Sequence, residues 1–196
     1  MDPEFLRATD LIDHVNPAIV TKARDLAHGL TTDAEVTHAC FRFVRDAIRH
    51  SSDHQLNPVT CRASDVLAHG TGYCFAKSHL LAALLRANDI PAGFCYQRLS
   101  IDDVGPPYTL HGFNAVHLRD HGWYRIDARG RKPGITSDFT PPVEALAYVP
   151  KLPGEADLPE IWPNPLPVVV NTLTNANTWQ DVLAHLPDIE PVDVHR

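Results

Sequence analysis

Residues 70 to 93, GTGYCFAKSHLLAALLRANDIPAG, contain a cysteine between a glycine-containing turn and a long apolar run. The apolar residues, which surround most of a helix starting at Cys74, are Leu80, Leu81, Ala83, Leu84, Leu85 and Ala87. Such a helix is expected to be buried on several sides. Asn88 and Asp89 end it, and Pro91 blocks its continuation. The sequence therefore places a thiol at the first turn of the most buried helix in the chain.

The position of Cys74 favours chemistry over packing. Unpaired N–H groups give a helix N-terminus a partial positive charge, which stabilises a thiolate. Gly70 and Gly72 allow close approach of the backbone and leave room for a substrate beside the thiol. The N–H of Cys74 itself points toward the oxyanion that attack by this sulfur creates. We therefore interpret Cys74 as a nucleophile, which needs a histidine base held by a third group.

The candidate base and its partner lie in residues 110 to 130, LHGFNAVHLRDHGWYRIDARG, which have the pattern of a β-hairpin. We expect one strand from His111 to Leu118 and a second from Trp123 to Ala128. If the connecting loop holds three or five residues, His111 lies opposite Asp127 or on its diagonal, on the same face of the hairpin. A loop of even length puts the two side chains on opposite faces. The parity of the loop is therefore a structural test of this pairing.

The N-terminal quarter of the chain is expected to be helical. Asn16 followed by Pro17 is typical of a helix N-terminus, and Gly29 closes that segment. Thr32 and Glu35 have the spacing of a capping box, which starts a second helix. The apolar residues behind it recur on one helix face and are Val36, Ala39, Cys40, Phe43, Val44, Ala47 and Ile48. Helices followed by short strands predict an α+β fold, with the Cys74 helix packed on an antiparallel sheet.

The C-terminal third of the chain contains most of its 17 prolines, a spacing that excludes long helices and central strands. Enough large apolar residues remain there that we expect an extended arm laid over the core, ending in a short helix from Thr178 to His185. The predicted organisation is a catalytic domain over 6–150 and a proline-rich arm over 151–196, packed on the same domain. Residues 1–5 resemble an expression-vector scar and are excluded from the fold. We expect the arm to cover the active-site cleft, so that trimming residues 150–196 broadens reactivity.

Composition excludes several function classes. The net charge is −7, and the 17 Lys and Arg residues form no cluster longer than Arg129 to Lys132, which disfavours a nucleic-acid partner. The longest apolar stretches, Leu80 to Leu85 and Pro165 to Val170, are too short to cross a bilayer, so we expect no membrane partner. No signal peptide opens the sequence, and none of the four cysteines forms a CxxC pair. We therefore expect reduced thiols and a cytoplasmic location.

Metal and nucleotide chemistry are weak alternatives. His117 and His121 with Asp120 offer metal-ligating atoms, but neither HExxH nor paired cysteines are present. The sequence HGTGYC lacks the lysine and the spacing of a phosphate-binding loop. We predict no metal site and no cofactor.

Three linked motifs resemble the transglutaminase-like, papain-related superfamily of cysteine enzymes. The pattern of that superfamily is a glycine-cysteine helix start, LLRA.GIPA at the helix end, and then HAW.EV and GW...D. The matching segments here are Gly72-Tyr73-Cys74, LLRANDIPAG, HGFNAV and GWYRID. The resemblance covers about residues 60 to 130, and the 16 positions from His111 to Asp127 suit the pattern.

The resemblance implies a papain-like, transglutaminase-core fold of the small bacterial type. It also implies a catalytic triad of Cys74, His111 and Asp127 that performs acyl transfer through a thioester. Two positions depart from the pattern: Phe113 replaces the tryptophan after the histidine, and Ala115 replaces a glutamate. We expect Phe113 still to wall the site, while the missing charge at position 115 affects the choice of substrate.

The remaining pocket residues are less clearly marked. Papain-like relatives place a glutamine upstream of the cysteine as an oxyanion donor, which favours Gln55 by residue type, with His54 next. Tyr96 and Gln97, on the strand after the buried helix, are further pocket candidates, and so is Tyr73 beside the nucleophile.

Three other histidines compete for a role. His117 shares the face of His111 and is the rival base, but six residues along a strand, ~20 Å, separate the two. His79 lies five residues into the buried helix and is expected to point away from a ligand at Cys74. His69 lies close to the glycine turn, where a surface position is the simplest reading.

The predicted function is cysteine-dependent acyl transfer on an amide bond of a peptide, a protein or a small amide. Hydrolysis, as a peptidase or amidase, is favoured by the resemblance to small members of the superfamily. Transfer to an amine acceptor, as in a transglutaminase, is the first alternative. A catalytically silent binding module is the second.

Overall fold

A computed structural model describes residues 2–190 of the chain. Its helices are the 3-10 helix η1 (Pro3–Leu6) and the α-helices α1 (Pro17–Ala27), α2 (Asp33–Ala47), α3 (Ser51–His54), α4 (Ala63–His69), α5 (Cys74–Arg86), α6 (Pro167–Asn175) and α7 (Trp179–Ala184). Its strands are β1 (Arg49–His50), β2 (Thr71–Gly72), β3 (Ala92–Ser100), β4 (Tyr108–Leu118), β5 (Gly122–Ile126), β6 (Asp138–Thr140), β7 (Val143–Ala145) and β8 (Ala156–Asp157). None of the described helices combines the length and apolarity that crossing a bilayer requires.

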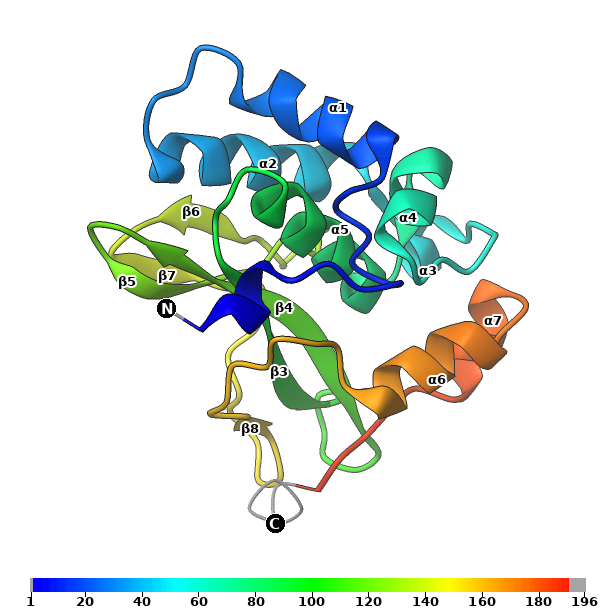
Figure 1. Cartoon of the computed structure of the whole chain (residues 1–196). Helices are drawn as coiled ribbons and strands as arrows, with labels where there is room; N and C mark the ends of the chain where they lie inside the picture. Colours follow the sequence, from blue (N-terminus) through cyan, green and yellow to red (C-terminus); the bar gives the residue numbers. More distant parts are fainter. Residues whose placement is uncertain (1, 191–196) are drawn as a thin grey trace.

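Helix α5 lies at the centre of the molecule. The helices α1, α2 and α4 pack around it on one side, and β3 and β4 pack on the other (Figure 1). Every residue of α5 is buried, as its nearly unbroken apolar sequence predicts. The predicted α+β fold, with the Cys74 helix packed on an antiparallel sheet, is confirmed.

The main sheet has the strand order β5-β4-β3-β8, and each pair in it is antiparallel. Two short pairs stand outside it: β1 with β2, which are parallel, and β6 with β7. All nine residues of β3 are buried. Both faces of β3 are therefore covered, one by α5 and the other by the C-terminal arm, whose Ile161 lies so close to Gly93 that a Cβ there would clash.

The helix starts read from the sequence are present. The Asn16 side chain accepts a hydrogen bond from the N–H of Ala18 at 3.0 Å, with Pro17 as the first residue of α1. Thr32 and Glu35 form the predicted capping box at the start of α2. These caps satisfy N–H groups that a helix leaves unpaired at its N-terminus.

The C-terminal arm is more regular than its prolines predict. Its last helix, α7, starts after a capping box at Thr178, close to the predicted range. Helix α6 was not predicted, because the prolines before it indicate a chain that avoids helix. Pro167 is however the first residue of α6, where a missing N–H costs nothing and the fixed φ suits the helix.

Residues near the N-terminus take part in the fold. Phe5 in η1 packs edge-on against Trp123 of β5, with 4.7 Å between the ring centroids. It also lies within 2.9 Å of the position that a Cβ on Gly93 would occupy. Phe5 is partly buried and covers part of the sheet, a packing role that the sequence did not indicate for residues 1–5.

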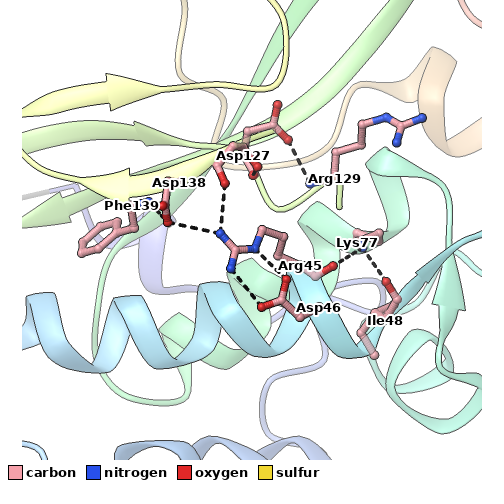
Figure 2. A network of polar contacts seen from close by, with 9 residues as sticks. Arg45, Asp46, Ile48, Lys77, Asp127, Arg129, Asp138 and Phe139 are labelled. Carbon is pink, nitrogen blue, oxygen red and sulfur yellow. Dashed lines mark hydrogen bonds and ion pairs between the residues drawn. The ribbon is translucent and has the colours of Figure 1, made fainter. Parts of the chain in front are cut away.

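Polar contacts fix the first turns of α5 against α2 (Figure 2). Lys77 donates from Nζ to the carbonyl oxygens of Arg45 and Ile48, at the end of α2. The guanidinium of Arg45 in turn binds the carboxylates of Asp46, at 2.7 Å, and of Asp138 in β6, at 3.2 Å. The helix that starts at Cys74 is thus tied to its neighbours one turn after the cysteine.

A buried amide holds the other side of α5 to the sheet. Asn114 of β4, which is fully buried, donates from Nδ2 to the carbonyl oxygens of Ser78 and Gly93, both at 3.1 Å. One side chain therefore connects α5, β3 and β4. Contacts of this kind leave α5 and β4 little freedom to shift relative to each other.

Candidate active site

The start of α5 presents Cys74 to a cleft. Cys74 is the first residue of the helix and 8% exposed, and no described side chain caps the helix N-terminus. Space beside Gly72, two residues before Cys74, is tight, since a Cβ there would lie 3.0 Å from the Cβ of Ala76 and 3.2 Å from Oγ1 of Thr60. Free N–H groups at a helix start favour a negative charge nearby.

The hairpin of β4 and β5 brings His111 and Asp127 together. Leu118 pairs with Gly122, so the loop has three residues and His111 and Asp127 fall on one face, as predicted for an odd-length loop. His111 lies in β4, and Asp127 directly follows β5. Nε2 of His111 lies 2.8 Å from Oδ2 of Asp127.

Asp127 is held in place from several sides. It is fully buried, and its carboxylate also accepts hydrogen bonds from the N–H of Arg129 at 3.0 Å and of Ala147 at 3.1 Å (Figure 2 shows the first). Although burial opposes a charged carboxylate, His111 and these two N–H groups hold the pKa of Asp127 below its ordinary value. Asp127 is therefore a fixed anion.

The electrostatics of His111 follow from this anion. Burial opposes protonation of the ring, but the Asp127 carboxylate and the neighbouring Cys74 raise the pKa of His111 to about 10. Since Asp127 occupies Nε2, the nitrogen left for the thiol is Nδ1. The imidazole thus has the Asp127 carboxylate on one nitrogen and Cys74 as a neighbour.

Aromatic rings set the orientation of the imidazole. Phe113 stacks on His111 with 5.8 Å between the ring centroids and 16° between the ring planes. Tyr148, from the segment after β7, meets the same ring edge-on at 4.8 Å. Phe113 thus supports the histidine from behind, but it is buried and does not line the cleft as expected. Tyr148, which the sequence pattern did not indicate, lines the cleft instead.

The cleft beside Cys74 has a volume of about 660 Å³. Among its lining residues are Cys74, His111 and Tyr73, together with His50 and Arg129. Arg129 makes a two-pronged ion pair with Asp53, at 2.7 and 3.1 Å. His50 and Arg129 were not predicted from the sequence as cleft residues. The position of Arg129 two residues after Asp127 was a sequence feature that could have indicated it.

The structure does not bring the predicted oxyanion donor to the cleft. Gln55 is exposed, adopts a left-handed backbone with φ of 54° after α3, and does not line the cleft. His54 is exposed as well and lies outside the lining. The reason is the short helix α3, which turns the chain away from the cleft after Ser52.

The pocket candidates on β3 are buried and do not line the cleft. The hydroxyl of Tyr96 accepts a hydrogen bond from the N–H of Leu166 at 3.1 Å, which anchors the start of α6. Gln97 pairs with His111 across the two strands, and its amide donates to the carbonyl of Tyr148 at 3.2 Å. Both side chains therefore support the walls of the site rather than its opening. Tyr73 lines the cleft, and its hydroxyl donates to the carbonyl of Trp179 at 2.6 Å.

The competing histidines lie elsewhere. His117 meets Trp123 edge-on at 5.5 Å, and it does not line the cleft. His79 is fully buried, with Nδ1 2.7 Å from the carbonyl oxygen of Cys61, and His69 is exposed. Residues 2–190 contain no cluster of His, Cys, Asp and Glu side chains arranged to hold a metal ion.

Comparison with known families agrees with this geometry. The model of the transglutaminase-like superfamily matches residues 20–128, more than half of the chain, and the chain belongs to this superfamily. The matched range includes Cys74, His111 and Asp127. No curated protein matches the chain significantly.

Two solved structures are similar to this chain at low sequence identity. The chain is similar to a "Putative Cysteine Protease from Cytophaga hutchinsonii", with a TM-score of 0.51 and 18% identity over 64% of this chain and 40% of that one. The periplasmic domain of TgpA from Pseudomonas aeruginosa gives a TM-score of 0.48 and 19% identity over 65% of this chain and 48% of that one. This chain spans less than half the length of either protein.

Proposed function

We propose that the protein is a thiol hydrolase that cleaves an amide bond of a peptide, a protein or a small amide. The observation that carries this proposal is the bond of 2.8 Å between Nε2 of His111 and Oδ2 of Asp127, which leaves Nδ1 for Cys74 at the start of α5. A histidine held by a buried carboxylate beside a cysteine at a helix N-terminus is the arrangement that activates a thiol.

The reaction has two steps. In the resting pair the thiol proton already lies on Nδ1 of His111, whose pKa is raised to about 10, and the thiolate sulfur of Cys74 bonds to the amide carbonyl carbon, giving a tetrahedral oxyanion. The C–N bond then breaks, His111 gives its proton to the leaving amine, and a thioester on Cys74 remains. Water, deprotonated by His111, attacks the thioester, which releases the carboxylic acid and restores the thiolate of Cys74 beside a protonated His111.

Alkylation by iodoacetamide, located by mass spectrometry, tests the nucleophile. Cys74 should react first, because burial raises the pKa of Cys40 to about 12, of Cys61 to about 11 and of Cys95 to about 12. At pH 7, His111→Ala should slow alkylation of Cys74 by at least ~10-fold, since the thiolate loses its imidazolium partner. His117→Ala, on the same strand, should leave the rate unchanged.

Equal labelling of all four cysteines, or no effect of His111→Ala, would contradict the proposal and favour a binding module. A second assay then separates hydrolysis from transfer. The protein is incubated with a glutamine-containing peptide mixture, with and without a labelled primary amine. Cleavage or deamidation without incorporation of label supports hydrolysis, whereas incorporation identifies an amine acceptor.

A further inference from the structure

His50 lies next to the start of α5 although 24 positions separate it from Cys74. The parallel pair of β1 and β2 sets His50 opposite Gly72, two residues before the cysteine. The ring of His50 meets that of Tyr73 edge-on at 5.3 Å, and His50 lines the cleft shared by Cys74 and His111. The pairing of β1 with β2 therefore fixes the position of His50 relative to the start of α5.

The two ring nitrogens of His50 differ in their surroundings. Nδ1 lies 3.2 Å from the hydroxyl of Ser52 and 3.7 Å from Oδ2 of Asp53. Nε2 has no partner among the described residues, and it is not one of the buried polar atoms sealed from solvent. Since the residue is only 7% exposed and lines the cleft, the opening for Nε2 is the cleft itself.

The charges around His50 favour a neutral ring. Burial and the nearby Arg129 guanidinium lower the pKa of His50 well below its ordinary value, although Asp53 acts in the opposite direction. The proposed role requires the tautomer in which Nδ1 accepts from the Ser52 hydroxyl and the ring proton lies on Nε2. A neutral ring with its N–H in the cleft donates a hydrogen bond without competing with His111 for the thiol proton.

We propose that His50 is the second oxyanion donor, and that its Nε2–H and the N–H of Cys74 together bind the oxygen of the tetrahedral intermediate. The proposal rests on the acyl transfer proposed above and assigns to His50 the role that the sequence suggested for Gln55. No proton is transferred by His50: the hydrogen bond strengthens as negative charge develops on the oxygen.

Two reactions of the Cys74 thiol distinguish oxyanion binding by His50 from an effect of His50 on the thiol itself. Alkylation by iodoacetamide forms no oxyanion, whereas acylation by p-nitrophenyl butyrate forms one. His50→Ala should therefore slow release of p-nitrophenol by ~10²–10³-fold while alkylation of Cys74 stays within about twofold of wild type. His50→Gln, which keeps an N–H donor, should recover part of the acylation rate, and the unchanged alkylation shows that the site is folded.

Each outcome has one meaning. If His50→Ala is acylated at the wild-type rate, His50 is not an oxyanion donor. If the rates of alkylation and acylation fall by the same factor, the substitution acts on the thiol itself, and the proposed role is wrong as well. If the wild-type protein is not acylated at Cys74 at all, the proposed acyl transfer fails instead.

A separate observation concerns the apolar wall of the same cleft. Most large apolar side chains of the described chain are covered, yet Ile101, Val149 and Leu183 are 42%, 67% and 48% exposed and all line this cleft. They come from the end of β3, the segment after β7 and helix α7, so three distant segments converge there. Exposed apolar residues that gather at one opening mark a binding surface.

Glu155, one of the two carboxylates that line this cleft, is already occupied. Glu155 accepts hydrogen bonds from the backbone N–H groups of Ser100, Lys151 and Leu152, at 2.8, 2.7 and 2.9 Å. Its role is to hold the segment before β8, and it is not free to select a cationic substrate. We infer that the wall binds an aliphatic group of the substrate, next to the carbonyl that Cys74 attacks; this too rests on the proposed acyl transfer.

Acylation of Cys74 by p-nitrophenyl acetate and p-nitrophenyl hexanoate tests the inference. The second-order acylation rate should be at least ~10-fold higher for the hexanoyl ester, because each buried CH₂ adds binding. Leu183→Asp should bring the ratio of the hexanoyl to the acetyl rate close to one. Leu30→Asp, at an exposed position outside the cleft, should leave this ratio unchanged. Equal rates for the two esters, or a ratio that survives Leu183→Asp, overturns the aliphatic preference. Failure of both esters to acylate Cys74 contradicts acyl transfer itself.

Discussion

Asp127 illustrates how one side chain sets the chemistry of the site. Three donors converge on its carboxylate: the His111 ring and two backbone N–H groups. The backbone donors fix where the charge lies, and the charge then decides which nitrogen of His111 faces the thiol. Because the carboxylate is fully buried, water does not weaken this interaction.

The first prediction concerns the charge on His111. Asp127→Asn should lower the pKa of His111 from about 10 toward or below its ordinary 6.5, because the carboxylate is lost while burial of the ring remains. An NMR titration of the labelled ring measures this, with Asp120→Asn in the exposed hairpin loop as the control. A pKa of His111 that does not move in Asp127→Asn would refute the assigned pairing.

The same shift predicts a pH dependence of stability. A histidine whose pKa is raised on folding stabilises the protein fully below its unfolded pKa of about 6.5, and this contribution is lost as the pH rises through about 10. The difference in unfolding free energy between wild type and His111→Gln should therefore narrow between pH 6.5 and pH 10. Denaturant unfolding at several pH values measures it, and a difference that widens over this range would exclude the raised pKa.

At the scale of elements, the site depends on how closely α5 approaches β4. Gly112, next to the base, makes this approach possible: a Cβ there would lie 2.6 Å from Cδ1 of Phe75, the residue after the nucleophile. Phe75 is itself buried at the edge of the cleft, so a Cβ on Gly112 would push its ring toward the cleft or move α5 away from β4. A single glycine thus sets the distance between the helix that carries Cys74 and the strand that carries His111.

Gly112→Ala should destabilise the protein by about 1–3 kcal/mol, since added volume in a packed core forces neighbours apart. It should also slow alkylation of Cys74, because the thiol and the imidazole separate. Thr32→Ala is the matched control. It removes the N-terminal cap of α2, which should lower the unfolding free energy by about 1 kcal/mol, and it should not change the alkylation rate of Cys74. An alkylation rate in Gly112→Ala equal to that of wild type would show that the spacing does not matter.

At the scale of the whole molecule, the C-terminal arm is part of the core. Its buried residues are Leu158, Val169, Leu173 and Val182. It also supplies the carbonyl of Pro163 to the buried guanidinium of Arg86, at 2.6 Å, and the N–H of Leu166 to Tyr96. The arm therefore completes the fold as well as forming one wall of the cleft.

Deletion of residues 151–196 should unfold the protein rather than broaden its reactivity. Losing several buried side chains, at about 2–5 kcal/mol each, exceeds the usual stability of a domain of about 5–15 kcal/mol. Circular dichroism on heating measures this, with the full chain as reference. A truncated chain that still melts cooperatively at the wild-type temperature would contradict this prediction and show that the fold does not need the arm. Point substitutions such as Leu183→Asp are the better probe of substrate choice, because Leu183 is half exposed.

Local sequence patterns were enough to predict the buried helix with Cys74 at its first turn, the caps of α1 and α2, and the hairpin in which an odd loop length puts His111 and Asp127 on one face. These features follow from local periodicity and from the parity of a strand, which neighbouring residues carry. Three features depend on long-range packing: His50 rather than Gln55 lines the cleft, Tyr148 packs against His111, and the arm enters the core. Those contacts join segments far apart in the chain, through the pairing of β1 with β2 and of β3 with β8, and no local pattern encodes which distant segments pair.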